Sequence, residues 1–165
     1  MGRPLFNYIF ENSTKFEDGR VNYRSSRINL VLAGVIVQDE KILLLKRSHK
    51  VLTYWGLWDF IGGYLDDWKL PEEKIMEEME EELAILPWDV LSIRRFRRVI
   101  QYDDIINKVR VNFPMMVIVK SWVVIKLDEE HTDYKRITHE DLANYDLVPW
   151  TKDLFDYILT FTSFY

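Results

Sequence analysis

Cysteine is absent from this chain of 165 residues. That absence excludes a disulfide framework, a thiolate zinc site and a cysteine nucleophile within the chain. Proline and glycine are also scarce, at five and six residues, and no segment enriched in them forms a linker. The length and the missing linker predict one well-packed domain. The lack of thiols suits a reducing compartment, so we expect a cytoplasmic protein.

Long hydrophobic runs are missing as well. The longest, residues 28–37, is about half as long as the roughly 20 residues that span a bilayer. Residues 1–27 lack the apolar core of a signal peptide. Positive charge is not in excess either, because the formal net charge is -5, and this disfavours non-specific binding to nucleic acid. We therefore expect no membrane insertion and no nucleic-acid partner.

What the chain does contain is typical of a folded protein, with 48% hydrophobic, 15% aromatic and 30% charged residues. Aliphatic runs at 28–37 and 41–46 predict a hairpin, and the glycines and tryptophans of 49–67 predict a structured loop around a short strand. A helix is predicted from Pro71 to about residue 84, before Pro87. Further predicted elements are strands at 93–102, 108–120 and 122–126 and a helix at 150–160. The chain is thus expected to mix α and β structure.

Residues 1–27 are irregular and form a predicted N-terminal arm outside a domain of residues 28–165. The arm carries Phe6, Tyr8, Phe10 and Phe16, and aromatic side chains at this density are usually packed against something. We expect the arm to pack on the domain. The same aromatics are compatible with a homodimer.

The predicted helix at 71–84 carries an unusual set of carboxylates. At about 100° per residue, Ile75, Met79 and Leu83 share one apolar face, while Glu78, Glu81 and Glu82 form an adjacent arc. Seven glutamates between positions 72 and 82 repel one another at spacings of three and four residues, and a bound cation would relieve that repulsion. The alternative is a solvated surface helix, which is the common fate of charge-rich helices.

A second pattern lies just upstream, where Trp-Gly-Leu-Trp-Asp-Phe-Ile-Gly-Gly occupies residues 55–63. Together with the glutamates it resembles the Nudix box, in which Gly, five residues, Glu, seven residues and Arg-Glu are followed by an aliphatic residue, any residue, Glu-Glu, any residue, Gly and an aliphatic residue. The residues that match in register are Gly63, Glu78, Met79, Glu81, Glu82 and Ile85. Outside the box, residues 35–47 look like the family's first hairpin, and residues 129–134 look like the segment that often precedes its last strand.

Three positions depart from the box. Lys69 stands in place of the first Glu, Glu77 in place of Arg, and Ala84 in place of Gly. In the family the first Glu and the Arg commonly interact and hold the loop against the helix. We hypothesise that Lys69 and Glu77 form the same loop-holding pair with the charges exchanged, although lysine lacks the bidentate geometry of arginine.

The resemblance implies an α/β/α sandwich around a mixed sheet and hydrolysis of a nucleoside diphosphate linked to another group. It implies Mg²⁺, with Mn²⁺ as an alternative, and clustered carboxylates without cysteine suit such ions. By resemblance, Glu78 and Glu82 would ligate the metal, Glu81 would ligate it or orient its water, and the carbonyl of Gly62 would complete the site. Glu130 is our candidate for a loop carboxylate acting as general base. The alternative interpretation of Glu130 is a solvated residue in an acidic turn.

Four further residues are candidates for binding a small nucleotide substrate. Arg47 follows the second strand, where family members often place a phosphate-contacting cation, while Trp55, Trp58 and Tyr64 could stack on a nucleobase. An ordinary strand-end cation and core aromatics are the competing interpretations. The rival function is a Nudix-fold binding or sensor module that holds a nucleotide without cutting it, which the departures at Lys69, Glu77 and Ala84 favour and the retained glutamates oppose.

Overall fold

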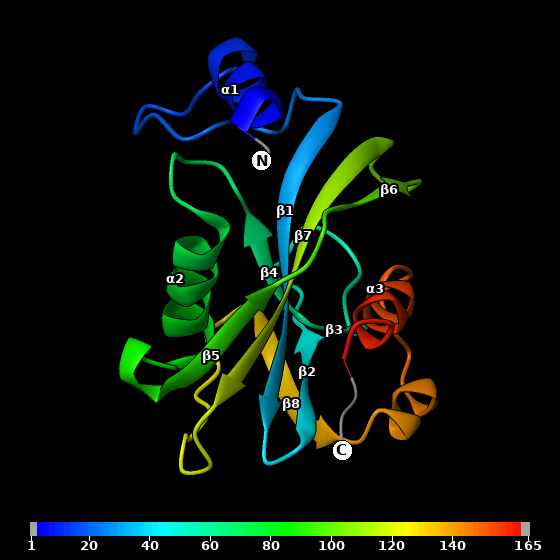
Figure 1. Cartoon of the computed structure of the whole chain (residues 1–165). Coiled ribbons are helices and arrows are strands. Elements are labelled where there is room, and N and C mark those ends of the chain that lie inside the picture. The colour runs from blue at the N-terminus through cyan, green and yellow to red at the C-terminus, as the bar shows by residue number, and fades with distance from the viewer. Residues whose placement is uncertain (1–2, 163–165) are drawn as a thin grey trace.

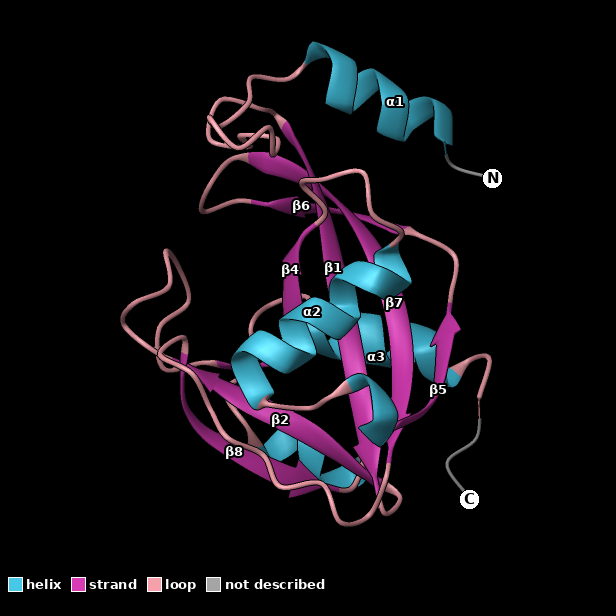
Figure 2. Ribbon diagram, turned by 90° about the vertical axis from the view of Figure 1, so that its left-hand side faces the viewer, coloured by secondary structure: helices cyan, strands magenta, loops and turns pink. Residues whose placement is uncertain are grey.

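The computed structural model describes residues 3–162 and arranges them as one mixed sheet with helices on both faces (Figure 1, Figure 2). None of the helices in that range is long and apolar enough to cross a membrane. The helices are α1 (Arg3–Asn12), α2 (Pro71–Leu83) and α3 (Thr151–Leu159), with 3-10 turns at Pro87–Asp89 and Glu140–Asn144. The strands are β1 (Ile28–Gln38), β2 (Lys41–Arg47), β3 (Trp58–Asp59), β4 (Ile61–Tyr64), β5 (Val90–Arg95), β6 (Val99–Asp103), β7 (Lys108–Val119) and β8 (His131–Ile137).

Strand β1 is the centre of the sheet. It pairs in parallel with β7, from Ile28 opposite Val109 to Val37 opposite Ile118, and antiparallel with β2 and β4. The outer strands extend the sheet on both sides, because β2 pairs with β3 and β8 while β7 pairs with β5 and β6. Nearly every residue of β1 is buried, as expected for a strand that helices cover on both faces.

Each face of the sheet has its own apolar core. On one face, Ile75, Met79 and Leu83 of α2 are fully buried against β1 and β7. On the other face, Phe155 and Ile158 of α3 pack in a second cluster with β1 and β2. Figure 2 shows α2 on the near side of the sheet and α3 behind it. The α/β/α sandwich around a mixed sheet is therefore confirmed.

Several elements differ from the prediction. The strand predicted at 93–102 is broken at residues 96–98, and its halves β5 and β6 pair with different parts of β7. The strand predicted at 122–126 is wrong, because the N–H of Lys126 donates to Leu83 at the end of α2 rather than to a neighbouring strand. Helix α1 lies in the arm that the sequence left irregular.

The arm packs on the loop that joins β4 to α2. Phe10 of α1 stacks on Trp68 at 4.6 Å between ring centroids. Further along, the Tyr23 hydroxyl donates to the Leu65 carbonyl at 2.6 Å, and the Val21 N–H donates to the Asp66 carbonyl at 2.6 Å. The arm thus contacts the segment that leads into the glutamate helix (Figure 1). The boundary at residue 28 stays a prediction.

Helix α2 ends in a strained residue, and this gives a stability prediction. Ala84 has φ 55°, in the left-handed region, where a Cβ costs roughly 1–2 kcal/mol. Glycine avoids that cost but loses more entropy on folding, so Ala84→Gly should raise the free energy of unfolding by about 0.5–1 kcal/mol. Urea unfolding measures it. The control Ala143→Gly, at an exposed position outside the left-handed residues, should not stabilise; equal effects at the two positions would contradict the explanation.

Candidate active site

A cleft of about 700 Å³ lies beside β4 and α2. Its lining brings together residues from segments far apart in the chain, including the arm, β2, β4, α2, β7 and the start of β8. All of the predicted metal and catalytic residues are in this lining: Gly62, Glu78, Glu81, Glu82 and Glu130. Arg47 lines it too. The residues predicted to bind metal or act in catalysis therefore share one cleft, while their individual roles stay predictions.

The two glycines of β4 permit close contacts in two different directions. A Cβ added to Gly63 would lie 2.3 Å from Oε1 of Glu78 on the glutamate helix, and one added to Gly62 would lie 2.6 Å from the carbonyl oxygen of Leu32 in β1. A side chain at Gly62 would therefore clash with backbone, and a side chain at Gly63 would displace the Glu78 carboxylate. The Glu78 carboxylate consequently rests directly against the backbone of β4.

Glu78 and Glu82 form a buried pair of like charges. Burial, together with repulsion from the neighbouring Glu78, Glu130 and Asp128, raises the pKa of Glu82 to about 10. Burial also raises the pKa of Glu78, against the attraction of Lys74. Two carboxylates this close cannot both ionise at low cost, so in the metal-free protein they share a proton. Glu130, whose pKa is likewise raised by burial and by Asp128, adds a third acidic group nearby.

This donor set fits a divalent cation with oxygen ligands, because a cation would compensate charges that the protein alone leaves crowded. No three acidic or histidine groups within residues 3–162 already converge as a closed ligand set. His131 stands beside the cluster, with Nδ1 3.7 Å from Oε2 of Glu82, and burial lowers its pKa, so it adds little positive charge there.

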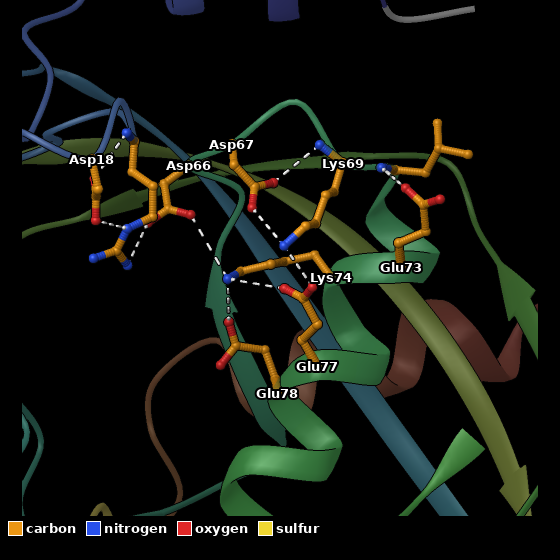
Figure 3. A network of polar contacts seen from close by, with 10 residues as sticks. Asp18, Asp66, Asp67, Lys69, Glu73, Lys74, Glu77 and Glu78 are labelled. Atoms are coloured by element: carbon orange, nitrogen blue, oxygen red, sulfur yellow. Dashed lines mark hydrogen bonds and ion pairs between the residues drawn. The ribbon is translucent and has the colours of Figure 1, made fainter. Parts of the chain in front are cut away.

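Lys74 is a site residue that sequence reasoning missed. Its ammonium group lies 3.5 Å from Oε1 of Glu78, 3.6 Å from Oε2 of Glu77 and 3.9 Å from Oδ1 of Asp66 (Figure 3). Asp66 is in turn 3.5 Å from Nη1 of Arg20 in the arm. A continuous set of ion pairs thus joins the arm to the glutamate helix. The available signal was one lysine among seven glutamates, which by itself resembles an ordinary surface pair.

The exchanged pair at the box departures is in contact, since the ammonium group of Lys69 touches the Glu77 carboxylate and also lies 3.2 Å from Oδ2 of Asp67 (Figure 3). Glu77 contacts Lys69 and Lys74 together. The contact agrees with the hypothesis of a swapped pair, and its role in holding the loop stays a prediction.

A double-mutant cycle tests that role. Lys69→Glu should lower activity or stability because it places like charges together, and adding Glu77→Arg should restore the loss by recreating an attractive pair. Thermal unfolding and turnover of the four proteins are the measurements. Additive effects in the two single variants would show that the pair does not act as a unit.

The predicted substrate residues lie in different environments. Arg47 faces the cleft while its Nε–H donates to the Thr53 carbonyl at 3.1 Å. Trp58 is 9% exposed and packs edge-on against Tyr145 in the α3-side core. Trp55 is exposed and its indole N–H donates to the Val51 carbonyl. Neither tryptophan is brought into the cleft lining; the aromatic residues that do line it are Phe16, Tyr23, Tyr54, Phe60, Tyr64 and Trp150.

Comparison with known proteins agrees with this fold. The family model described as NUDIX domain matches residues 29–158, and the chain belongs to the Nudix hydrolase superfamily. Among curated proteins, it is 26% identical over 128 residues to nucleoside triphosphatase NudI of Escherichia coli O139:H28, covering 73% of this chain and 89% of that protein.

Solved structures share the fold at lower identity. The MutT protein from Methanosarcina mazei Go1 superimposes with a TM-score of 0.66 at 21% identity, covering 82% of this chain and 96% of that one. The NUDIX domain of Shewanella oneidensis NrtR, complexed with ADP ribose, superimposes with a TM-score of 0.64 at 20% identity, covering 79% and 88%. Members of this family typically use divalent metal ions.

Proposed function

We propose that this protein is a Mg²⁺-dependent pyrophosphohydrolase that cleaves the diphosphate linkage of a nucleoside diphosphate derivative or a nucleoside triphosphate. The observation that carries the proposal is the buried Glu78–Glu82 pair within the cleft, in which the Glu78 carboxylate lies against Gly63. Crowded carboxylates are costly unless they serve a cation. The similarity to a nucleoside triphosphatase supports a nucleotide substrate.

The roles proposed for the individual residues follow from their positions. Glu78 and Glu82 would hold Mg²⁺, with the Gly62 carbonyl as a further ligand and Glu81 orienting bound water. Mg²⁺ neutralises diphosphate charge and activates water for attack at phosphorus; Mn²⁺ would supply the same chemistry. Glu130 is proposed as the general base, because burial and Asp128 raise the pKa of Glu130 toward the range in which a base works near neutral pH. Arg47 would contact the phosphates.

A panel assay tests the proposal. With Mg²⁺ and ADP-ribose, nucleoside triphosphates, dinucleoside polyphosphates or nucleotide sugars, we expect turnover of at least one class, and Glu82→Gln should reduce it by about 100-fold or more. The matched control is Glu80→Gln, on the exposed side of the same helix, which should retain activity. Product analysis by ion-exchange chromatography also identifies the phosphorus that is attacked.

The alternative is a Nudix-fold binding or sensor module, favoured by the departures at Lys69, Glu77 and Ala84. Absence of turnover across the panel, together with nucleotide binding that Glu82→Gln leaves unchanged, would support that module over the enzyme. A cytoplasmic location and a homodimer stay predictions, as does the absence of a nucleic-acid partner.

A further inference from the structure

A second polar site surrounds Arg110 of β7, in a part of the cleft lining that α2 does not supply. The Arg110 guanidinium stacks over the indole of Trp150 at 4.0 Å from the ring centroid, and its Nη1 lies 3.7 Å from Oδ2 of Asp103. Its side chain is only 17% exposed, and that of Asp103 is fully buried. The charged or ionisable groups with the strongest electrostatic interactions with Arg110 are Asp59, Tyr64, Asp103 and Arg47. None of them is on the glutamate helix.

This site has unused hydrogen-bonding capacity. Seven buried side-chain polar atoms in the described part of the chain lack a partner, and four of them belong to residues at this site: Nδ2 and Oδ1 of Asn29, Oδ2 of Asp103 and Nε of Arg110. Asn29 is fully buried and directly opposite Arg110 in the parallel β1–β7 pairing, so both side chains emerge on the same face of the sheet. Buried polar groups are normally satisfied, so the unpaired groups around Arg110 make this part of the cleft suited to a polar ligand.

Tyr54 adds a strained residue at the same place. Its hydroxyl donates to Oδ1 of Asp103 at 2.8 Å, and its ring packs edge-on against Trp150 with centroids 5.0 Å apart. Its φ of 61° is in the left-handed region, which is rare for a bulky residue and tends to occur at ligand sites. The loop is therefore held in an unfavourable conformation that brings an aromatic ring and a hydroxyl to the Arg110 site.

We propose that Arg110, backed by Asn29 and Asp103, is the residue that recognises the nucleobase of the substrate, and that the preferred base is guanine. This inference rests on the proposed function for the identity of the ligand as a nucleotide. Arg110 is a planar donor, and guanine offers it two adjacent acceptors, O6 and N7. Asp103 is fully buried, lies 3.7 Å from Nη1 of Arg110 and is not among the residues that line the cleft, so it positions the guanidinium rather than contacting the base. Adenine instead presents an amino donor where guanine has O6, which a guanidinium cannot accept.

A base fits this site better than a second phosphate does. The ion pair of Arg110 with Asp103 leaves no net charge, and the site contains orphaned acceptors as well as orphaned donors. A phosphate would satisfy the donors but leave the carboxylate and amide oxygens facing more negative charge. The rings of Tyr54 and Trp150 also suit a planar heterocycle.

The test measures base preference separately from catalysis. GMP and AMP are titrated by calorimetry in EDTA, into the wild type and Arg110→Lys, which keeps the charge opposite Asp103 but loses the planar pair of donors. We expect the wild type to prefer GMP by about tenfold or more, and Arg110→Lys to reduce that ratio to about threefold or less. The control Arg94→Gln removes an arginine that also stacks on a ring, Phe96, but is not among the residues that line the cleft; it should leave the ratio unchanged.

The outcomes separate this inference from the proposed function. A GMP preference that depends on Arg110, in a protein without turnover, would leave the inference standing while the hydrolase proposal fails. Turnover with an unaltered GMP-to-AMP ratio in Arg110→Lys would overturn the inference and leave the hydrolase proposal intact. Equal loss of affinity for both nucleotides, or tighter binding of AMP by the wild type, would also overturn it. Circular dichroism of each variant reports whether the fold is retained.

Discussion

Lys74→Met is expected to lower the free energy of unfolding by about 3 kcal/mol at pH 7, the range found when one partner of a buried ion pair is removed. The methionine keeps much of the volume but leaves Glu78 and Asp66, whose side chains are 12% and 10% exposed, without their shared cation. Burial lowers the pKa of Lys74, but the attraction of Glu78, Asp66, Asp67 and Glu77 outweighs it, so the net pKa is raised and the lysine is charged. Urea unfolding at fixed pH gives the measurement.

The loss of unfolding free energy in Lys74→Met should increase as the pH rises. Without Lys74, the folded-state pKa values of Glu78 and Asp66 rise further above their unfolded values, so the variant loses stability as pH increases and the carboxylates are forced to ionise. The difference from wild type should be small at pH 4 and reach its full size near pH 7. Lys152→Met, which breaks an exposed pair with Asp156 on α3, is the matched control and should change stability little at either pH. A penalty equal at both pH values would point to lost packing instead.

Glu82→Gln should have opposite effects on activity and on the stability of the metal-free protein. The pKa of Glu82 is raised to about 10, first by burial and then by Glu78, so the folded protein retains a proton that the unfolded chain releases near its ordinary pKa of 4.5. Stability therefore falls as pH rises from that value toward 10. Glutamine removes this dependence, because its amide can donate to Glu78 as the protonated acid does. Each unit of difference between the folded-state and unfolded-state pKa that the substitution removes changes the free energy of unfolding by about 1.4 kcal/mol.

Thermal unfolding in EDTA from pH 4 to pH 9 measures the effect. The variant and the wild type should unfold at similar temperatures at pH 4, and the variant should become progressively more stable as pH rises. Mg²⁺ should reduce the difference in unfolding temperature between the variant and the wild type. It should stabilise only the wild type, because metal binding favours the ionised carboxylates. Glu80→Gln, exposed on the same helix, should show no such trend. A variant less stable than wild type at pH 8 would contradict the assignment of a buried, proton-sharing pair.

The sequence predicts the chemistry of α2 because short-range rules govern it. Helical spacing places Glu78 and Glu82 on one edge of the helix, and the register with Gly63 predicts the contact with β4 that the structure contains. Pro71 begins the helix as expected. The hairpin of β1 and β2 is also predictable from two aliphatic runs and a short polar turn.

The rest depends on tertiary contacts that no local pattern encodes. Arg110 is one of two cations near the start of β7, and only the parallel pairing with β1 brings it beside Asn29. Trp58 is predicted to lie in a structured loop and is a candidate for stacking on a nucleobase, yet its side chain packs in the α3-side core. Residues 122–126 have the composition of a strand, but the Lys126 N–H donates to the carbonyl of Leu83 at the end of α2 instead of to a neighbouring strand. Lys74 and Lys69 are lysines within the same acidic stretch, but Lys74 is buried and Lys69 is exposed. The sequence does not distinguish them.

The long parallel pairing of β1 with β7 has a consequence for how the chain folds. Partners in this ladder, such as Ile28 and Val109, are separated by 109 − 28 = 81 positions, so the central strand cannot complete its pairing until most of the chain has been synthesised. Contacts of such high sequence separation slow folding, because loop closure must precede the stabilising interactions. Meanwhile β1, one of the most apolar segments of the chain, remains open to pairing with other molecules. Yield of native protein should therefore be limited by aggregation during synthesis rather than by the stability of the finished fold.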